Sequence, residues 1–260
     1  MNKEITPRVL IWDLETSFNL AYTFEVGYDR NIPYQNIVTE RHLICVSYKW
    51  LGEKQIHSIS ILDDKKRFKN DVHDDFYVAS EFRKILEQAD AQIYHYGSMF
   101  DTPMLNARLA FHKLPAVPKI PTIDTKKVAA KYFRFNCNKL DYLAKHLGYK
   151  GKMDNAGNLW MKCFEGDVDA IEHMVKYNKQ DVDINEFVYN ALKPFIQNHP
   201  LNRNLFTKEV VCSTCGSANI QWRGFYRTRV NKYRRYSCND CGSWSVERKT
   251  IKDDIKPQVR

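Results

Sequence analysis

The chain has 260 residues, of which 43% are hydrophobic and 13% aromatic. It can therefore bury the core of one α/β domain beside a smaller second domain, and this composition excludes global disorder. No apolar stretch is long enough to span a bilayer, and the short apolar run near the N-terminus is broken by acids too early for a signal peptide. We expect a protein that stays inside the cell and has no membrane partner.

The net charge of +9 is concentrated near the C-terminus. Residues 208–260 contain 12 basic and 5 acidic residues, which gives +7, whereas the rest of the chain has 28 basic and 26 acidic residues, which gives +2. Nucleic acid is the first candidate for a polyanionic partner of this basic segment. The alternative is a basic surface that only maintains solubility.

The predicted secondary structure begins with a continuous apolar run that is typical of a central strand covered on both faces. Strands and amphipathic helices follow, around a charged segment at 63–75 that we expect to be a loop. This order predicts an α/β fold with a mixed sheet flanked by helices. The expected strands are 9–14, 43–51, 55–62 and 91–97, and the expected helices are 76–89, 102–112, 126–132, 139–147 and 167–195.

Acidic residues stand where two of these strands end. Asp13 and Glu15 are two residues apart at the end of the first strand, so their side chains point to the same face. Two such charges are costly side by side unless they are neutralised, and a divalent cation is the usual counter-ion. Asp101 follows another buried strand at the start of a helix, where it reaches the same edge of the sheet, caps the helix, or does both.

Two further candidates lie on the long helix expected at 167–195. Tyr177 and Asp181 are four residues apart, and thus about one turn apart on one helix face. Asp183 lies nearby but faces a different direction. The alternative for Tyr177 is a tyrosine of the core.

These segments resemble the three motifs of the DEDD 3′–5′ exonucleases, in the subgroup with tyrosine in the third motif. They read DLET at 13–16, HYGSMFD at 95–101 and YNKQDV at 177–182, in the same order along the chain. The segments at 123–125, 138–148 and 160–182 are similar to the predicted polymerase-B-type exonuclease branch. Tyr96 is a departure, because it stands where such enzymes commonly have an asparagine that helps to position substrate.

The resemblance implies a ribonuclease H-like fold and hydrolysis of the terminal phosphodiester of single-stranded nucleic acid, with DNA favoured over RNA. It also implies two Mg²⁺ or Mn²⁺ ions, which activate a water and stabilise the leaving oxygen in two-metal sites. Oxygen ligands favour these ions over zinc. Tyr177 would orient the attacking water. The implied metal ligands are Asp13, Glu15, Asp101 and Asp181, and the implied catalytic residues are these four and Tyr177.

For other residues near the motifs, a direct role in binding metal or substrate is less strongly indicated. Asp124 opens a helix, so we expect a cap or a supporting partner more than a metal ligand. His95 is expected in the core or behind the metal ligands. The aromatic residues after the first motif either stack on terminal bases or pack within their own loop; they are Tyr22, Phe24 and Tyr28.

Two C-x-x-C pairs near the C-terminus provide four thiolates at the spacing of a structural zinc site. Each pair is followed by a glycine, which suits a tight turn. We therefore expect residues 208–260 to form a zinc ribbon with one Zn²⁺, joined by a linker at 200–207 to a nuclease domain at 1–199. The expected ligands are Cys212, Cys215, Cys238 and Cys241, whereas Cys45, Cys137 and Cys163 are expected to be inert thiols.

Basic and aromatic residues are interleaved between the two cysteine pairs. This combination is typical of single-strand binding, in which cations hold phosphates and rings stack on bases. The alternatives are that some of these aromatic residues form the core of the ribbon, or that the ribbon docks on a protein. The expected nucleic-acid-binding residues are Trp222, Arg223, Arg227, Arg229, Lys232, Arg234 and Arg235, beside Phe225, Tyr226, Tyr233 and Tyr236.

The leading hypothesis is a metal-dependent 3′–5′ exonuclease that acts on single-stranded DNA with a free 3′ end, with the ribbon holding the strand. A replication-type protein is a further candidate partner. The alternative is a nucleic-acid-binding or adaptor protein with an inactive nuclease fold. The complete set of five implied catalytic residues argues against an inactive site.

Overall fold

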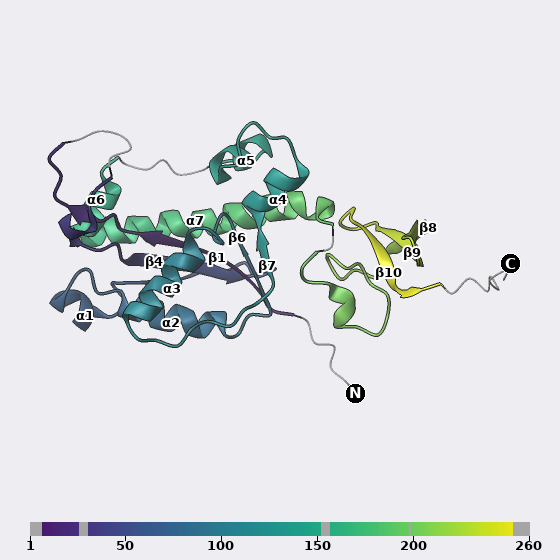
Figure 1. Ribbon diagram of the computed structural model, residues 1–260, viewed down its shortest axis with the longest axis horizontal. Helices are drawn as coiled ribbons and strands as arrows, with labels where there is room; N and C mark the ends of the chain where they lie inside the picture. The colour runs from purple at the N-terminus through teal and green to yellow at the C-terminus, as the bar shows by residue number, and fades with distance from the viewer. Residues whose placement is uncertain (1–6, 26–30, 152–156, 198, 252–260) are drawn as a thin grey trace.

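The computed structural model describes residues 7–25, 31–151, 157–197 and 199–251. Its larger part is a five-stranded sheet in the order β5-β4-β1-β6-β7, in which β1 is antiparallel to β4 and parallel to β6 (Figure 1). The predicted mixed sheet is confirmed. Its strands are β1 (Val9–Thr16), β4 (Leu43–Trp50), β5 (His57–Ser60), β6 (Ala91–Tyr94) and β7 (Thr122–Asp124), and β2 (Leu20–Ala21) pairs separately with β3 (Ile37–Thr39).

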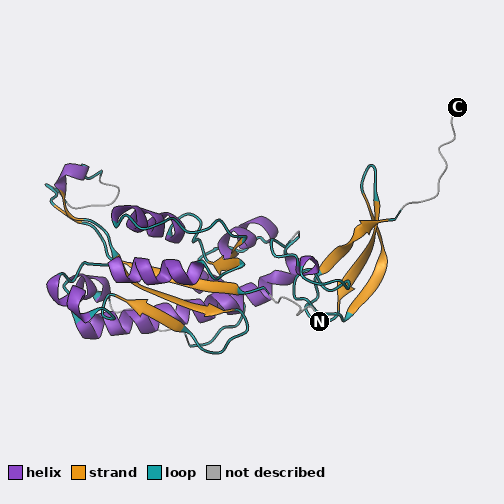
Figure 2. Ribbon diagram, turned by 90° about the horizontal axis from the view of Figure 1, so that it is seen from below, coloured by secondary structure: helices purple, strands orange, loops and turns teal. Residues whose placement is uncertain are grey.

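Helices flank this sheet, as predicted (Figures 1 and 2). The longest, α7, packs against β1 and β4, while α2 packs against β4 and β5 and also contacts α3. Among the described residues, no helix is both long and apolar enough to cross a membrane. The helices are α1 (Lys65–Asn70), α2 (Phe76–Leu86), α3 (Asp101–Phe111), α4 (Thr125–Tyr132), α5 (Leu140–His146), α6 (Leu159–Phe164) and α7 (Val168–Leu192), with 3-10 turns at Tyr34–Asn36, Lys193–Phe195 and Arg203–Leu205.

The central strand β1 contributes apolar side chains to two hydrophobic clusters. Leu10 and Trp12 belong to one cluster, and Val9 and Ile11 to the other. Successive side chains of a strand point to opposite faces, so a continuous apolar run supplies both. This double burial explains why the first strand of the chain lies in the middle of the sheet.

The prediction of a loop at 63–75 is wrong, because part of this segment forms α1. Asp64 caps this helix by accepting a hydrogen bond from the backbone N–H of Arg67 at 3.1 Å. A helix of one or two turns shows too little apolar periodicity to be recognised from sequence. The short elements β2, β3, β7 and α6 escape prediction for the same reason, and the strand expected at 91–97 ends earlier, at Tyr94.

A three-stranded antiparallel sheet lies beyond the C-terminal end of α7 (Figures 1 and 2). Hydrogen bonds connect it to the segment that precedes it. The side-chain amide of Asn204 donates to the hydroxyl of Tyr236 at 3.1 Å, and that hydroxyl donates to the carbonyl of Val211 at 2.9 Å. The same segment is also tied to α7, because the hydroxyl of Tyr189 on that helix pairs with Nε2 of His199 at 3.0 Å. The strands are β8 (Ile220–Arg227), β9 (Lys232–Cys238) and β10 (Trp244–Thr250), in the order β10-β9-β8.

A buried polar network holds the start of β4 against α2 and α3. The carboxylate of Asp75 is fully buried and accepts hydrogen bonds from Nε and Nη2 of Arg108 at 2.7 and 2.9 Å. It also accepts from the backbone N–H of Leu43 at 2.8 Å and contacts Nε2 of His112 at 2.6 Å. Burial alone would raise the pKa of Asp75, but these partners outweigh burial and hold the pKa below its ordinary value.

His42, next to this network, makes the stability of the fold dependent on pH. Burial lowers its pKa from 6.5 to about 4, and the neighbouring His73 contributes to the same shift. The unfolded chain therefore binds more protons than the folded chain between these pH values, and stability falls as the pH falls through this window. We predict that a change from pH 7 to pH 5 lowers the free energy of unfolding of the wild type by about 2 kcal/mol more than that of His42→Gln, because glutamine cannot be protonated.

Urea unfolding of both proteins at the two pH values measures this difference. An equal loss of stability in the wild type and in His42→Gln would contradict the burial of a neutral His42.

Candidate functional site

The first two predicted metal ligands lie on one face of β1. Asp13 and Glu15 are half-buried, and Leu14 between them is buried, which is the expected alternation of a strand. On the neighbouring strand, Cys45 lies opposite Glu15. Burial raises the pKa of the Cys45 thiol well above its ordinary value, and the two nearby carboxylates raise it further. This thiol therefore stays protonated beneath the acidic pair.

Asp101, the first residue of α3, lies beside an edge of β1 that is left open. The pairing of β1 with β6 stops at Ile11, so the backbone N–H of Leu14 needs another partner. Asp101 supplies it, with Oδ1 accepting from that N–H at 3.2 Å. Its side chain does not cap α3. Burial raises the pKa of Asp101 to about 7.

Tyr177 and Asp181 lie one turn apart on α7 and line a cavity together with Asp13. Both side chains are buried. The ring of Tyr177 contacts Trp160 edge-to-face, with 6.2 Å between the ring centroids. Asp183 is directed elsewhere, because it accepts a hydrogen bond from the hydroxyl of Tyr149 at 2.8 Å.

Three of the four predicted carboxylates converge. Oxygen atoms of Asp13, Glu15 and Asp181 all lie within 4.8 Å of one another. Asp101 is not one of this triplet, but it lines the same cavity, which has a volume of about 360 Å³. Like charges this close repel one another unless a cation neutralises them, and a set of carboxylate oxygens suits a hard divalent ion. These residues can therefore hold Mg²⁺ or Mn²⁺.

Asn178 is a residue of this site that the sequence analysis missed. Its side chain is completely buried, and its amide nitrogen donates to Oδ2 of Asp13 at 2.7 Å. The bond ties α7 to β1 and restricts the orientation of the Asp13 carboxylate. A signal existed in the sequence, because Asn178 precedes Asp181 by three positions and such residues are neighbours on one helix face.

The loop between β6 and α3 is anchored by residues that were expected to support the site. Asp124 caps α4 and also accepts hydrogen bonds from the backbone N–H of Tyr96 at 2.9 Å and from the hydroxyl of Ser98 at 2.7 Å. The carboxylate of Asp124 is outside the acidic triplet. Nδ1 of His95 pairs with the hydroxyl of Thr125 at 2.9 Å. Both residues thus hold the loop that leads to Asp101.

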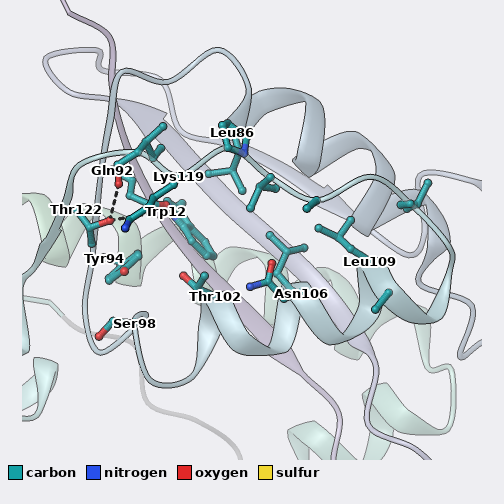
Figure 3. A pocket seen from close by; sticks show the side chains of 17 residues that line it. Trp12, Leu86, Gln92, Tyr94, Ser98, Thr102, Asn106, Leu109, Lys119 and Thr122 are labelled. Atoms are coloured by element: carbon teal, nitrogen blue, oxygen red, sulfur yellow. Dashed lines mark hydrogen bonds between the residues drawn. The ribbon is translucent and has the colours of Figure 1, made fainter.

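A larger cavity, of about 540 Å³, is lined by α3 and the loop that follows it (Figure 3). It contains none of the predicted metal ligands, and most of its lining is apolar. At one end, Nε1 of Trp12 donates to Oε1 of Gln92, and Nε2 of Gln92 donates to the hydroxyl of Thr122, both at 3.0 Å. Because carboxylates gather only at the smaller cavity of the two, we place the candidate active site there.

The four predicted zinc ligands also converge, with all Sγ atoms within 4.8 Å of one another. Sγ of Cys212 is 3.6 Å from that of Cys241, and Sγ of Cys215 is 3.7 Å from that of Cys238. A disulfide would require about 2.0 Å. Tetrahedral zinc, with Zn–S bonds of about 2.3 Å, places sulfur atoms about 3.8 Å apart. The glycines after the two pairs have φ of 82° and 75°, a conformation that glycine adopts without strain.

Cationic and aromatic side chains stack on one another along β8 and β9. The guanidinium of Arg234 lies 3.8 Å from the ring centroid of Trp222, and Nζ of Lys232 lies 4.6 Å from that of Phe225. Tyr236, opposite Trp222, is buried, so this aromatic residue belongs to the core of the small sheet. Phe225 is 48% exposed. The other basic residues of the predicted surface are exposed; they are Arg223, Arg227, Arg229 and Arg235.

The aromatic residues after the first motif do not pack into the protein where they are described. Tyr22 is 76% exposed and Phe24 is fully exposed. Tyr28, the third residue of this group, lies outside the described residues. The two described rings are therefore available to a partner.

Comparison with known proteins bears on the fold. The sequence model of the RNase_H superfamily matches residues 39–193. This range includes Asp101, Tyr177 and Asp181, whereas Asp13 and Glu15 precede it. The solved structure of the family B DNA polymerase from the hyperthermophilic archaeon Pyrobaculum calidifontis is similar, with a TM-score of 0.55 and 16% identity over 76% of this chain. The similarity covers 26% of the polymerase chain. No curated protein matches the sequence.

At 16% identity, the likeness to the polymerase concerns the fold alone. The family match covers more than half of the chain and agrees with the mixed five-stranded sheet flanked by helices. The ribonuclease H-like fold that the sequence predicts is therefore confirmed. The chain belongs to the RNase_H superfamily.

Proposed function

We propose that the protein is a metal-dependent 3′–5′ exonuclease that removes terminal nucleotides from single-stranded nucleic acid, with DNA favoured. The convergence of Asp13, Glu15 and Asp181 in a cavity that Asp101 and Tyr177 also line carries this proposal. Membership of the RNase_H superfamily supports a nuclease in general. The resemblance to the DEDD motifs is the basis for the 3′–5′ polarity.

In this proposal, Asp13, Glu15, Asp101 and Asp181 hold two Mg²⁺ or Mn²⁺ ions, which supply an activated water and stabilise the leaving oxygen when bound. The residues of the chain position the reacting groups. Asn178 restrains Asp13 through its hydrogen bond to Oδ2. The hydroxyl of Tyr177 orients the attacking water, while the contact of its ring with Trp160 keeps it in place.

Asp181→Asn removes one ligand charge and preserves the shape of the side chain. We predict that this change lowers Mg²⁺- or Mn²⁺-dependent digestion by more than about a hundredfold. Removal of a residue that only hydrogen-bonds to a metal ligand lowers activity about 10–100-fold, and removal of a ligand itself should lower it further. Asp183→Asn is the matched control, since Asp183 lies two residues further on α7 and contacts Tyr149. Its activity should equal that of the wild type.

The assay is digestion of single-stranded DNA and RNA oligonucleotides that carry a label at the 3′ or the 5′ end, with and without a chelator. Stepwise shortening from the 3′ end that needs the metal is expected, and the faster substrate identifies the preferred sugar. Absence of cleavage with either metal, while oligonucleotides still bind, would instead indicate an inactive nucleic-acid-binding protein. An equal decrease in both variants would contradict the role of Asp181 as a ligand.

We also propose that the four clustered cysteines bind one structural Zn²⁺ in a ribbon at 208–260, which a linker at 200–207 joins to the nuclease domain at 1–199. The spacing of the sulfur atoms supports this assignment. Four thiolates close the coordination shell and leave no position for a substrate. Such a small unit has little core of its own, so the metal contributes much of its folding free energy.

Cys215→Ser should lose this zinc, whereas Cys137→Ser should keep it, because Cys137 is not part of the cluster. The wild type is expected to contain one zinc per chain by elemental analysis, which thiol modification releases. Purified wild type with four reactive thiols and no zinc, even after supply of the metal, would refute this site.

We propose further that the exposed cations and rings of β8 and β9 hold the nucleic acid strand. Arg234 and Lys232 each lie over an aromatic ring, and thus offer a charge for a phosphate beside a surface for a base. The excess of positive charge in residues 208–260 also favours binding of a phosphate backbone.

The double change Arg234→Gln and Lys232→Gln should weaken binding of single-stranded DNA by the full chain. It should also reduce the salt dependence of log K by about 0.7 for each phosphate that the variant no longer neutralises. Fluorescence anisotropy at several salt concentrations measures both effects, with Lys66→Gln on the distant α1 as the control. A salt dependence identical to that of the wild type would favour docking of the ribbon on a protein.

A further inference from the structure

Tyr96 has a backbone conformation that tyrosine rarely adopts. Its φ is 67°, in the left-handed region. Asp124 fixes this turn by accepting hydrogen bonds from the backbone N–H of Tyr96 and from the hydroxyl of Ser98. Gly97 follows, and a Cβ atom at this position would lie 2.4 Å from the ring of Tyr94. The surrounding structure thus enforces an unfavourable conformation, which is typical of residues at ligand sites.

The ring of Tyr96 lies at the rim of the carboxylate cavity. It lines the same cavity as Asp13 and Asp181, yet its side chain is 43% exposed. Nζ of Lys126 is 3.4 Å from the ring centroid, so an ammonium group covers one face of the ring. Lys139 lines the cavity as well. The candidate metal site is therefore bordered by an aromatic ring and by Lys139, and Lys126 adds a second cation against that ring.

We propose that Tyr96 and Lys126 form a subsite for the base and the phosphate of the nucleotide at the 3′ end, an inference that rests on the proposed nuclease function. The base stacks on the part of the phenol ring that Lys126 leaves uncovered. The ammonium group of Lys126 attracts the phosphate of the same nucleotide. Stacking does not read the edges of a base, so this subsite accepts all four bases.

The left-handed conformation dictates which substitutions test this subsite. Asparagine tolerates this region of φ and ψ, so Tyr96→Asn removes the ring with little strain in the loop. Tyr96→Phe keeps the ring and removes only the hydroxyl. Lys126→Gln removes the cation. Met99→Ala is the matched control, because Met99 lies in the same loop, is 61% exposed and does not line the cavity.

The direct readout is the fluorescence of 2-aminopurine placed at the 3′ end of a single-stranded DNA, titrated with each protein in Ca²⁺ to slow hydrolysis. Stacking on the ring should quench this fluorescence in the wild type, Tyr96→Phe and Met99→Ala. We expect Tyr96→Asn to abolish the quenching and to bind about tenfold more weakly. An oligonucleotide with an abasic 3′ nucleotide should bind the wild type and Tyr96→Asn equally. In digestion assays, Lys126→Gln should raise KM and leave kcat unchanged.

The outcomes separate this inference from the proposed function. Quenching and affinity in Tyr96→Asn equal to those of the wild type would overturn the subsite, even if digestion from the 3′ end continues. If the wild type digests no oligonucleotide but still quenches the terminal base, and Tyr96→Asn does not, the nuclease proposal fails and the subsite stands. A decrease in affinity that is equal for abasic and intact ends would show a defect of the loop and refute base stacking.

Discussion

Electrostatic repulsion among Asp13, Glu15 and Asp181 is the constraint on which the functional account depends. Their oxygen atoms lie within 4.8 Å of one another in a partly buried cavity. Such an arrangement is costly without a cation, and the surrounding structure maintains it. The alternation of β1 aligns two of the acids, α7 contributes the third, and Asn178 ties the strand to the helix. Geometry that concentrates negative charge in this way is suited to binding divalent ions.

The helix α7 links the two candidate sites. Near its middle it carries Tyr177 and Asp181, and Tyr189 near its end meets His199 in the segment that leads to the cysteine cluster. Tyr189 lies eight positions after Asp181, which corresponds to about 12 Å along the helix axis. The helix thus connects the carboxylate cavity, with Tyr96 at its rim, to the segment that precedes the cysteine cluster.

Local patterns in the sequence predicted the α/β class, most of the longer elements and the spacing within each motif. The continuous apolar run before Asp13 indicated a central strand, and the four-residue spacing of Tyr177 and Asp181 indicated one helix face. What the sequence could not supply depends on contacts between distant segments. Asp101 bonds to Leu14 because the pairing of β1 with β6 stops early, and no local pattern encodes where a strand pair ends. The short helix α1 was missed because none of its residues is buried, so it has no apolar periodicity, and the cap at Asp64 is its main local signal.

Anomalous diffraction would reveal whether these carboxylates bind two divalent ions. Crystals of the protein soaked with Mn²⁺ and a nucleoside 5′-monophosphate would be measured at a wavelength where manganese scatters anomalously. We expect two peaks about 3.5–4 Å apart, between Asp13, Glu15, Asp101 and Asp181. An empty carboxylate cavity at millimolar Mn²⁺, in crystals that otherwise diffract well, would show that these residues are not a two-metal site.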